Sequence, residues 1–346
     1  MLCRNINTFT FKSTLLNLLF DNHGRQINYL RMAVTDRCNL RCFYCMPEEG
    51  IRYLPKKDLL SFKEILRLVS ILSDLGVSKV RLTGGEPFVR NDLMNLIRSI
   101  VEISGIGDLH LTTNGVLTRP HIPELKKANI ASVNLSLDTL DRARFLAITR
   151  RDEFVAVMDT FHALVEYGIP VKINAVVMDG KNIDDIIPLI ELSKQYPVDV
   201  RFIEEMPFNG EGSHYNKLNW THVRILQHIK AAYPDIYKAD DPAFSTSANY
   251  RIPGHAGQIG IIAAFSRTFC GTCNRIRVTA QGTLKTCLYD NGVLDIRDLL
   301  RSTQDDGLIS EKLMQAFRSR PKDGFEAELN RKDHAPLAES MSTIGG

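Results

Sequence analysis

The chain has 346 residues, of which 44% are hydrophobic and 24% charged, and its formal net charge is +3. These values are ordinary for a globular protein, and the length predicts roughly two domains. The small net charge gives no overall indication of nucleic-acid binding, and no apolar run approaches the roughly 18 residues of a membrane span. We therefore expect a cytoplasmic protein with no nucleic-acid and no membrane partner.

The first twenty residues are expected to form a separate N-terminal leader. They carry Arg4 and Lys12 and no acidic residue, and they end in the run LLNLLF. Such a composition is faintly similar to a targeting segment. The apolar part is short and is interrupted by Asn17. We therefore expect a short amphipathic leader over residues 1–20.

Apolar, β-branched runs alternate with helical patterns over residues 21–204. The clearest helix begins after Ser61, where Glu64 completes a capping box, and it ends at Gly76. Strand–helix alternation predicts a parallel sheet, and six such units are two short of a complete (β/α)8 barrel. We therefore expect an α/β fold containing a partial (β/α)6 TIM-like barrel. Its candidate strands are 29–34, 78–83, 108–112, 132–137, 170–177 and 198–204.

Several of these strands alternate polar and apolar residues, whereas buried parallel strands are normally apolar throughout. Because the apolar face must pack on helices, the polar face should line the interior of the barrel. Burying several cations without partners would cost several kcal/mol each, so we expect a cavity that takes a large anionic ligand. A solvated edge face is the alternative. The polar positions are Lys79, Arg81, Thr83, Asn134, Ser136, Asp138, Lys172 and Asn174.

The strand–helix rhythm stops after residue 204. Residues 205–346 contain a helical stretch near 220–232, a loop-rich section over 240–257 and a polar ending. We expect a smaller C-terminal domain here, built around a group of cysteines.

Six of the seven cysteines form two groups of three. The first trio is Cys38, Cys42 and Cys45, and the second is Cys270, Cys273 and Cys287. A cubane iron–sulfur cluster usually takes four thiolates, one per iron, and a structural zinc takes four protein ligands. Two trios therefore suggest two clusters, each with one iron open to a non-protein ligand. Zinc stays an alternative for the second trio, with His255 as a possible fourth ligand.

The turn after the second predicted strand contains two adjacent glycines. It reads Gly84-Gly85-Glu86-Pro87, where glycine lets the backbone approach a ligand closely and Glu86 could accept a bond from an ammonium group. The first trio lies at the end of the preceding strand, where active sites of βα folds gather, with the aromatic Tyr44 before its third cysteine. The two motifs together resemble the radical S-adenosylmethionine (SAM) superfamily. This resemblance implies that the first trio holds a 4Fe–4S cluster, whose open iron chelates SAM before one electron cleaves it to a 5′-deoxyadenosyl radical.

Basic residues gather on the predicted strands although the net charge is small. Arg275 and Arg277 alternate on a predicted strand beside the second trio. Arginine presents a planar fork that matches phosphate, so the combined set suits a triphosphate. The other members of this set are Arg31, Lys79, Arg81, Lys172 and Arg201.

A longer series of segments, from residue 21 to the last residue, is similar to the GTP 3′,8-cyclase family of molybdenum cofactor (molybdopterin) biosynthesis. It includes YLRMAVTDRCNLRCFYC, KVRLTGGEP, LTTNG, NLSLD, VKINAVV, RFIEEM, the segment CGTCNRIRVTAQGTLKTC and a terminal diglycine. The resemblance implies a radical SAM lyase that abstracts hydrogen from ribose C3′ of GTP, after which C3′ attacks guanine C8. It also implies a second 4Fe–4S cluster on the second trio, facing the guanine base.

The same resemblance implies roles for individual residues and for partners. Contacts to SAM fall on Tyr44, Gly85, Ser136 and Met206. Contacts to GTP fall on Arg31, Arg81, Thr112, Lys172, Arg275 and Arg277, and Arg275 or Arg277 assists the late reduction. The C-terminal tail, which the pattern alone would leave disordered, is expected to reach the active site. A low-potential electron donor and the next enzyme of the molybdopterin pathway are the implied protein partners, and the chain is expected to be a monomer or homodimer.

Departures from the family pattern are small. Residues 1–13 are extra, and Glu205 stands where relatives usually carry an apolar residue. Two other functions stay open. One is a peptide-modifying radical SAM enzyme, although such chains carry more cysteines in a longer C-terminal array. The other, from a different class, is a zinc-stapled nucleotide-binding regulatory protein.

Overall fold

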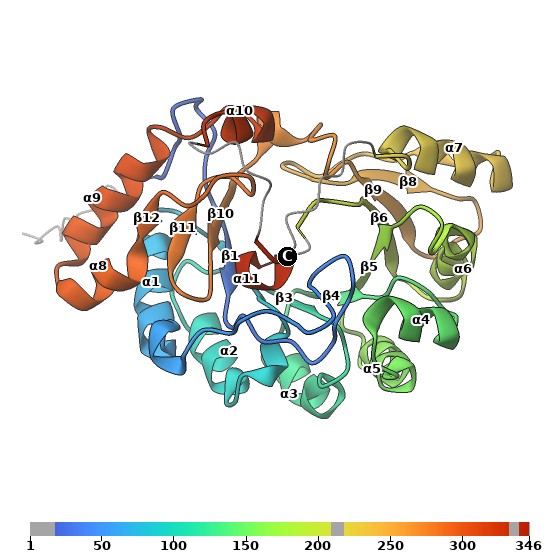
Figure 1. The fold of residues 1–346 in the computed structure, drawn as a ribbon, viewed down its shortest axis with the longest axis horizontal. Helices are drawn as coiled ribbons and strands as arrows, with labels where there is room; N and C mark the ends of the chain where they lie inside the picture. Colours follow the sequence, from blue (N-terminus) through green and yellow to red (C-terminus); the bar gives the residue numbers. More distant parts are fainter. Residues whose placement is uncertain (1–17, 209–217, 332–338, 346) are drawn as a thin grey trace, which may run out of the picture.

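One twelve-stranded sheet organises the chain, in the order β12-β11-β10-β1-β2-β3-β4-β5-β6-β9-β8-β7 (Figure 1). The computed structural model describes residues 18–208, 218–331 and 339–345. The six predicted barrel strands are neighbours in sequence order, all parallel, and each matches its predicted range to within one residue at either end. They are β1 (Tyr29–Ala33), β2 (Lys79–Thr83), β3 (Asp108–Thr113), β4 (Ser132–Ser136), β5 (Val171–Val177) and β6 (Asp199–Glu204).

Helices cover the outside of these strands, as Figure 1 shows. The first, α1 (Phe62–Asp74), begins after Ser61, whose hydroxyl accepts from the Glu64 amide while the Glu64 carboxylate accepts from the Ser61 amide. The predicted capping box is therefore confirmed. The helices that follow are α2 (Leu93–Val101), α3 (Ile122–Lys127), α4 (Arg142–Thr149), α5 (Phe154–Glu166) and α6 (Ile186–Gln195). Their apolar sides and the strands form one continuous hydrophobic core.

Strands from the C-terminal part extend both edges of this sheet. β10 (Arg275–Val278) pairs in parallel with β1, and β9 (Gln258–Ile262) pairs in parallel with β6. Eight neighbouring strands are therefore parallel, two more than the sequence predicted. The antiparallel strands at the edges are β11 (Thr283–Lys285), β12 (Leu294–Asp295), β8 (Ala248–Arg251) and β7 (Tyr237–Lys238).

Within the section 240–257 that was predicted to be loop-rich, the structure has one strand, β8. This strand forms because it pairs with β9, a partner that local sequence pattern does not reveal. α7 (His222–Ala232) agrees with the predicted helical stretch. The last helices are α8 (Ile296–Ser302), α9 (Asp306–Phe317), α10 (Gly324–Leu329) and α11 (Met341–Ile344). Since strands from both sides of residue 204 share one sheet, the domain boundary there stays a prediction.

The two ends of the chain differ in position. The last described residues form α11, which lies at the centre of the barrel (Figure 1). Residues 1–17 of the predicted leader lie outside the described residues. Leu19 is already buried, and its amide donates to the carbonyl of Leu75, so the chain joins the core from there.

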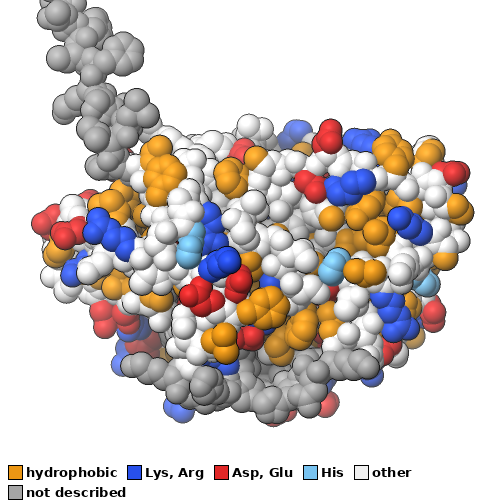
Figure 2. Space-filling model, turned by 90° about the horizontal axis from the view of Figure 1, so that it is seen from above, with side chains coloured by type: hydrophobic (Ala, Val, Ile, Leu, Met, Phe, Trp, Pro, Cys, Tyr) orange, Lys and Arg blue, Asp and Glu red, His pale blue; other side chains and the backbone are white. Residues whose placement is uncertain are grey.

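The surface differs from the barrel interior in its charge distribution. Figure 2 shows Lys and Arg interspersed with Asp and Glu on one face of the molecule, as the small net charge leads one to expect. In the part of the chain that the structure describes, no helix has the length and apolar character to cross a membrane.

Candidate functional site

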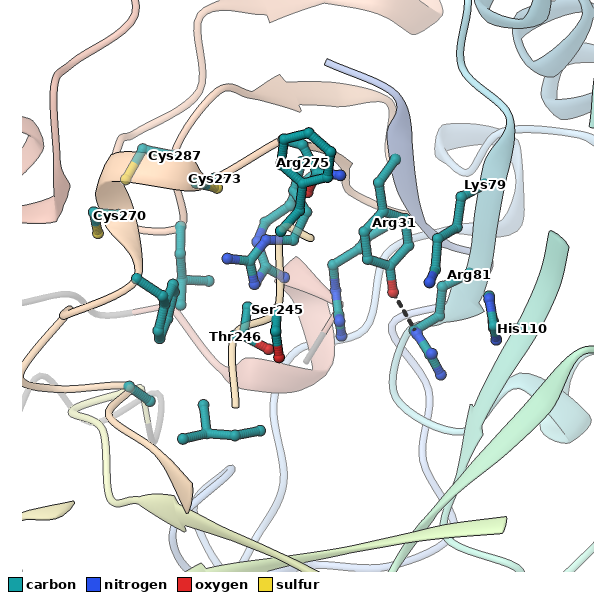
Figure 3. Close-up of a pocket in the computed structure, with 18 of the residues that line it drawn as sticks. Arg31, Lys79, Arg81, His110, Ser245, Thr246, Cys270, Cys273, Arg275 and Cys287 are labelled. Carbon is teal, nitrogen blue, oxygen red and sulfur yellow. Dashed lines mark hydrogen bonds between the residues drawn. The ribbon is translucent and has the colours of Figure 1, made fainter. Parts of the chain in front are cut away.

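A pocket of about 720 Å³ lies inside the barrel. This volume falls within the usual range for small-molecule and cofactor sites. All seven basic residues predicted to bind a triphosphate line it, and we call this set the cation wall: Arg31, Lys79, Arg81, Lys172, Arg201, Arg275 and Arg277. Figure 3 shows Arg275, Arg31, Lys79 and Arg81 around the same space, with the second cysteine trio at one end.

Sheet register brings the cations of three strands side by side. Arg31 of β1 is paired with Arg277 of β10 on one side and with Arg81 of β2 on the other. Burial first, and then the charge of Arg277, lowers the pKa of Arg31 well below its usual value. Charges of one sign are costly at this spacing, so the wall suits a ligand that carries several negative charges.

Tyr29 supplies part of the counter-charge within the wall, and no sequence motif indicated it. Its hydroxyl accepts a hydrogen bond from Arg81 Nε at 2.6 Å. Although burial raises the pKa of Tyr29, the charges of Arg81, Arg31 and Lys79 lower it to about 7. The phenol can therefore ionise near neutral pH, which distinguishes it from an ordinary tyrosine.

Two other residues predicted to contact the substrate form hydrogen bonds with side chains of the protein itself. Lys172 Nζ donates to Asp199 Oδ2 at 2.7 Å, and Thr112 Oγ1 accepts from Arg81 Nη1 at 3.4 Å. Thr112 therefore contacts Arg81 of the cation wall and does not itself line the pocket. Its contact with substrate stays a prediction.

The barrel interior also holds buried polar atoms without a hydrogen-bond partner among the described residues. They are His110 Nε2, Asn134 Oδ1, Asn174 Oδ1 and Arg201 Nε. All four residues line the pocket. An unpaired buried polar group costs roughly 1–3 kcal/mol, so these atoms favour a polar ligand that satisfies them. Strand alternation pointed to Asn134 and Asn174, whereas His110 was not among the predicted polar positions.

The second trio closes one end of this pocket. Cys270 and Cys273 belong to the turn that precedes β10, Cys287 follows β11, and all three line the pocket (Figure 3). Although burial raises the pKa of the Cys273 thiol, the charges of Arg275 and Arg320 lower it to about 6. Burial raises the pKa of Cys287 to about 11.

His255 does not join this trio, which corrects its proposed role as a fourth zinc ligand. Its Nδ1 lies 2.8 Å from Ser193 Oγ of α6, and its ring contacts Tyr233 near the end of α7. Across the described ranges, no three His, Cys, Asp or Glu residues are grouped as ligands of one metal ion. A cubane instead gives each thiolate its own iron, an arrangement that does not need three ligands grouped around one ion.

The first trio occupies the loop between β1 and α1. Cys38 Sγ accepts hydrogen bonds from the Leu40 amide at 3.4 Å and from Asn114 Nδ2 at 3.6 Å. Burial raises the pKa of Cys38 to about 11 and that of Cys45 to about 12. All six cysteines of the two trios are free of disulfides. Soft thiolates that receive N–H donors fit an iron–sulfur cluster.

Tyr44 fixes the first cysteine loop to the end of β4. Its hydroxyl donates to Asp138 Oδ2 at 2.8 Å, and Asp138 Oδ1 accepts from the Val176 amide at 2.8 Å. Burial raises the pKa of Asp138 to about 6. Ser136, two residues earlier, is half-buried at the end of β4. The alternation contained Asp138, but nothing in the sequence gave it this role.

The two positions after β2 must be glycine because they pack closely against the backbone of the first cysteine loop. Gly84 has a φ of +137°, and a Cβ there would lie 2.3 Å from the Thr35 carbonyl oxygen. A Cβ on Gly85 would lie 2.3 Å from the Arg37 carbonyl oxygen. The close approach that glycine permits therefore joins the turn to the backbone of the cysteine loop.

Glu86 joins the turns that follow β2 and β3. Its carboxylate has no exposed surface and accepts from the Phe88 amide at 3.1 Å, the Thr113 hydroxyl at 2.9 Å and the Asn114 amide at 2.7 Å. Burial raises the pKa of Glu86 to about 7. These donors give the carboxylate a role in positioning Asn114 beside Cys38, and its predicted contact with an ammonium group stays a prediction.

The described end of the chain, residues 339–345, lies between the two trios. Ser340 Oγ donates to the Cys45 carbonyl at 2.7 Å, whereas the Gly345 carbonyl accepts from Arg277 Nη1 at 3.0 Å and from Arg31 Nη2 at 3.5 Å. The segment therefore reaches the active-site region, as the family resemblance implied. Gly346 lies outside the described residues.

Two further contacts anchor this segment. Glu339 forms an ion pair with Lys285, whose side chain is completely buried. Ile344 packs in a small hydrophobic cluster with Phe208 and Tyr289, and Met206, which lines the pocket, packs against the same cluster. These contacts hold residues 339–345 beside the second trio.

Family models match most of the chain. The Radical SAM superfamily model matches residues 32–193, and the Molybdenum Cofactor Synthesis C model matches residues 198–326. The first model implies a 4Fe–4S cluster and SAM. The two matches meet near the predicted boundary after residue 204.

Curated relatives carry two kinds of name. GTP 3′,8-cyclase of Syntrophomonas wolfei is 41% identical over 95% of this chain and 100% of its own length. Mitochondrial GTP 3′,8-cyclase of Arabidopsis thaliana is 40% identical over 87% of this chain and 77% of its own. Molybdenum cofactor biosynthesis protein 1 of Bos taurus is 42% identical over 92% of this chain. The match covers 49% of that bovine protein, so the chain spans about half the length of the animal relatives.

Solved structures show the same fold at low sequence identity. SuiB of Streptococcus suis bound to S-adenosylmethionine has a TM-score of 0.59 and 16% identity, over 84% of this chain and 69% of SuiB. SuiB bound to its precursor peptide SuiA has a TM-score of 0.59 and 17% identity, over 93% of this chain and 77% of SuiB. At such identity the likeness concerns the fold alone.

Proposed function

Because the chain belongs to the GTP 3′,8-cyclase family of the radical SAM superfamily, we propose that it converts GTP to (8S)-3′,8-cyclo-7,8-dihydroguanosine 5′-triphosphate. This is the first step of molybdenum cofactor biosynthesis. The observation that carries the proposal is one pocket that combines seven basic residues with a cysteine trio, beside the loop of a second trio.

The first trio is proposed to hold the 4Fe–4S cluster that binds SAM, through Cys38, Cys42 and Cys45. When bound, this cluster supplies the electron that cleaves SAM and yields the 5′-deoxyadenosyl radical. Tyr44, Gly85, Glu86, Ser136 and Met206 are proposed to surround SAM. Support comes from the Tyr44–Asp138 hydrogen bond, which fixes the loop against β4, and from the place of Met206 in the pocket lining.

The cation wall is proposed to bind the triphosphate of GTP. Hydrogen bonds to charged groups contribute about 1.5–3 kcal/mol each, and paired guanidinium donors fix direction as well as distance. The register that places Arg31 between Arg81 and Arg277 gives three such donors on neighbouring strands. Their role is to hold ribose C3′ where hydrogen abstraction and attack on guanine C8 can occur, since positioning alone lowers a barrier substantially.

The second trio is proposed to hold another 4Fe–4S cluster, through Cys270, Cys273 and Cys287, that orients the guanine. Support comes from their place at the far end of the pocket that the cation wall lines (Figure 3). Arg275 and Arg277 lie between the trio and the rest of the wall, and we propose that one of them assists the late reduction. The C-terminal segment covers this region and helps to exclude water from a radical reaction.

Partners of the reaction are proposed on the same basis. A low-potential electron donor must serve the first cluster, and the product must pass to the next enzyme of the molybdopterin pathway. We propose a cytoplasmic setting and a monomeric or homodimeric state.

The deciding experiment is anaerobic incubation of the purified chain with SAM, dithionite and GTP. We expect 5′-deoxyadenosine together with the cyclised dihydro-nucleotide, which is an isomer of GTP, and no product when SAM is omitted. ATP in place of GTP should give no cyclised product. Formation of 5′-deoxyadenosine without consumption of GTP would keep the radical chemistry and reject the substrate.

A further inference from the structure

A network of three charged side chains lies directly behind the second trio. Asp21 Oδ2 accepts from Arg25 Nε at 2.6 Å and from Arg320 Nη1 at 3.1 Å. The Asp21 side chain is fully buried, and those of Arg320 and Arg25 are 3% and 9% exposed. Asp21 Oδ1 also accepts the amides of His23 and Arg25, each at 2.9 Å. A buried, fully bonded ion pair of this kind holds its guanidinium groups in one orientation.

Arg320 bonds to both segments that supply the second trio. Its Nε donates to the Thr286 carbonyl at 2.9 Å, next to Cys287, and its Nη1 donates to the Cys273 carbonyl at 2.9 Å. Its Nη2 lies 3.1 Å from Cys273 Sγ and 3.4 Å from the Arg275 carbonyl oxygen. One guanidinium therefore joins the turn before β10 to the end of β11 and donates an N–H to a ligand sulfur.

Arg25 completes the contact with the trio. Its Nη1 donates to the Cys270 carbonyl at 2.8 Å and to the Lys322 carbonyl at 2.8 Å. Thus every cysteine of the second trio, or the residue beside it, is bonded to Arg25 or Arg320. By contrast, Cys38 in the first trio accepts hydrogen bonds from the neutral groups of Leu40 and Asn114.

We propose that Arg320 is a positioning residue for the second 4Fe–4S cluster, orienting the Cys273 thiolate and raising the reduction potential of that cluster, with Asp21 fixing the guanidinium. This inference rests on the part of the proposed function that assigns a cluster to the second trio. Hydrogen bonds to cluster sulfurs and nearby charge are known determinants of cluster potential. Loss of such an outer contact typically costs about 10–100-fold in metal affinity.

The test uses the full chain with Cys42→Ala, so that the second trio holds the iron that is observed. In this background, Arg320→Gln removes the charge and most donors, Arg320→Lys keeps the charge, and Asp21→Asn releases the guanidinium. The matched control is Arg67→Lys, because Arg67 of α1 likewise donates to backbone carbonyls and to a carboxylate, here those of Leu300 in α8, Thr303 and Asp306 at the start of α9. Iron loss to a chelator and the midpoint potential, from a titration followed by electron paramagnetic resonance, are measured.

We expect Arg320→Gln to lose iron about 10–100-fold more readily and to shift the midpoint potential to more negative values. Arg320→Lys should shift the potential in the same direction by less, Asp21→Asn should increase iron loss because it releases the guanidinium, and the control should match the parent. An unchanged potential in loaded Arg320→Lys protein, together with unchanged iron loss in Asp21→Asn protein, overturns the proposal even if Arg320→Gln does not fold. A second trio that takes up no iron in the parent also overturns it. Neither readout requires GTP, so failure of GTP conversion alone leaves this role standing.

Discussion

The two cysteine trios have the same number of thiols but differ in the charged residues beside them. The first lies near the carboxylates of Glu86 and Asp138, which add to the burial that raises the thiol pKa values of Cys38 and Cys42. The second lies beside Arg275 and Arg320, whose charges lower the thiol pKa of Cys273 despite burial. Nearby negative charge disfavours an added electron, and nearby positive charge favours it.

The two trios also differ in construction. The first comes from one continuous loop of eight residues, Cys38–Cys45, fixed by Tyr44 and Asn114 to the strands around it. The second is assembled from two segments that Arg320 joins. The number of cysteines led to the proposal of two clusters, and the surrounding charges support the proposed division of labour between them. In that proposal the first cluster is strongly reducing and the second orients the substrate.

Removing one cysteine from each trio gives the largest expected effect and tests this division directly. Cys42→Ala should abolish SAM cleavage, because the cluster that supplies the electron is lost. Cys287→Ala should still form 5′-deoxyadenosine but no cyclised nucleotide. Chromatography of both products under anaerobic conditions measures the outcome. If Cys287→Ala abolished SAM cleavage while Cys42→Ala spared it, the two assignments would be reversed.

A substitution in the cation wall should separate substrate binding from SAM cleavage. Arg277→Lys keeps the charge but removes the fork, and a lost hydrogen bond to a charged group costs about 1.5–3 kcal/mol. We expect KM for GTP to rise about tenfold to hundredfold, with cleavage of SAM retained. Tyr44→Phe is the matching change beside the first trio and should affect SAM cleavage instead. Equal effects of both variants on both steps would contradict the separation.

The segment between the trios can be loosened through its buried ion pair. Glu339→Gln removes the carboxylate that pairs with the completely buried Lys285. An unpaired buried donor costs roughly 1–3 kcal/mol, so we expect a loss of that order in the free energy of unfolding. Denaturant titration measures it. Lys285→Met combined with Glu339→Gln should lose less than Glu339→Gln alone, since no buried charge then remains; a larger loss would show that packing dominates.

The pH dependence of Tyr29 is expected to have only a small effect near neutral pH. Its pKa in the folded chain is about 7, against 10.0 for an ordinary tyrosine. The phenolate therefore stabilises the fold increasingly as pH rises from 7 to 10, by at most about 1.4 kcal/mol per pH unit, and adds nothing below 7. We expect the unfolding free energies of the parent and of Tyr29→Phe to diverge over that window, less steeply because Tyr29 is half-buried. Parallel curves would place its pKa near the ordinary value.

Local pattern predicted the central part of the fold and much of the site. The six strands, the Ser61–Glu64 capping box and the polar faces of β2 and β5 follow from residues close together in sequence. Both edge extensions were missed, because β10 pairs with β1 and β9 pairs with β6 across long stretches of chain. Pairing between distant segments leaves no periodic signal in either one.

The same reason explains which site residues were missed. Asp21 and Arg320 are 299 residues apart, and neither belongs to a motif. His110 was missed although its strand reads Asp108-Leu109-His110-Leu111, an alternation that places His110 on the polar face, and although it lines the pocket. The cysteines, by contrast, could be recognised as candidate metal ligands from their spacing in the sequence alone. Motifs therefore predicted the proposed reacting groups, and only tertiary contacts showed which residues hold them in place.

The parallel strands do not close on themselves, and the two outermost strands explain how the protein tolerates this. β7 (Tyr237–Lys238) and β12 (Leu294–Asp295) have two residues each, and each includes a charged residue. Exposed backbone at a sheet margin invites pairing with another molecule, and short, charged margins oppose such pairing. An incomplete cylinder can therefore stay open to a bulky nucleotide without becoming a template for aggregation.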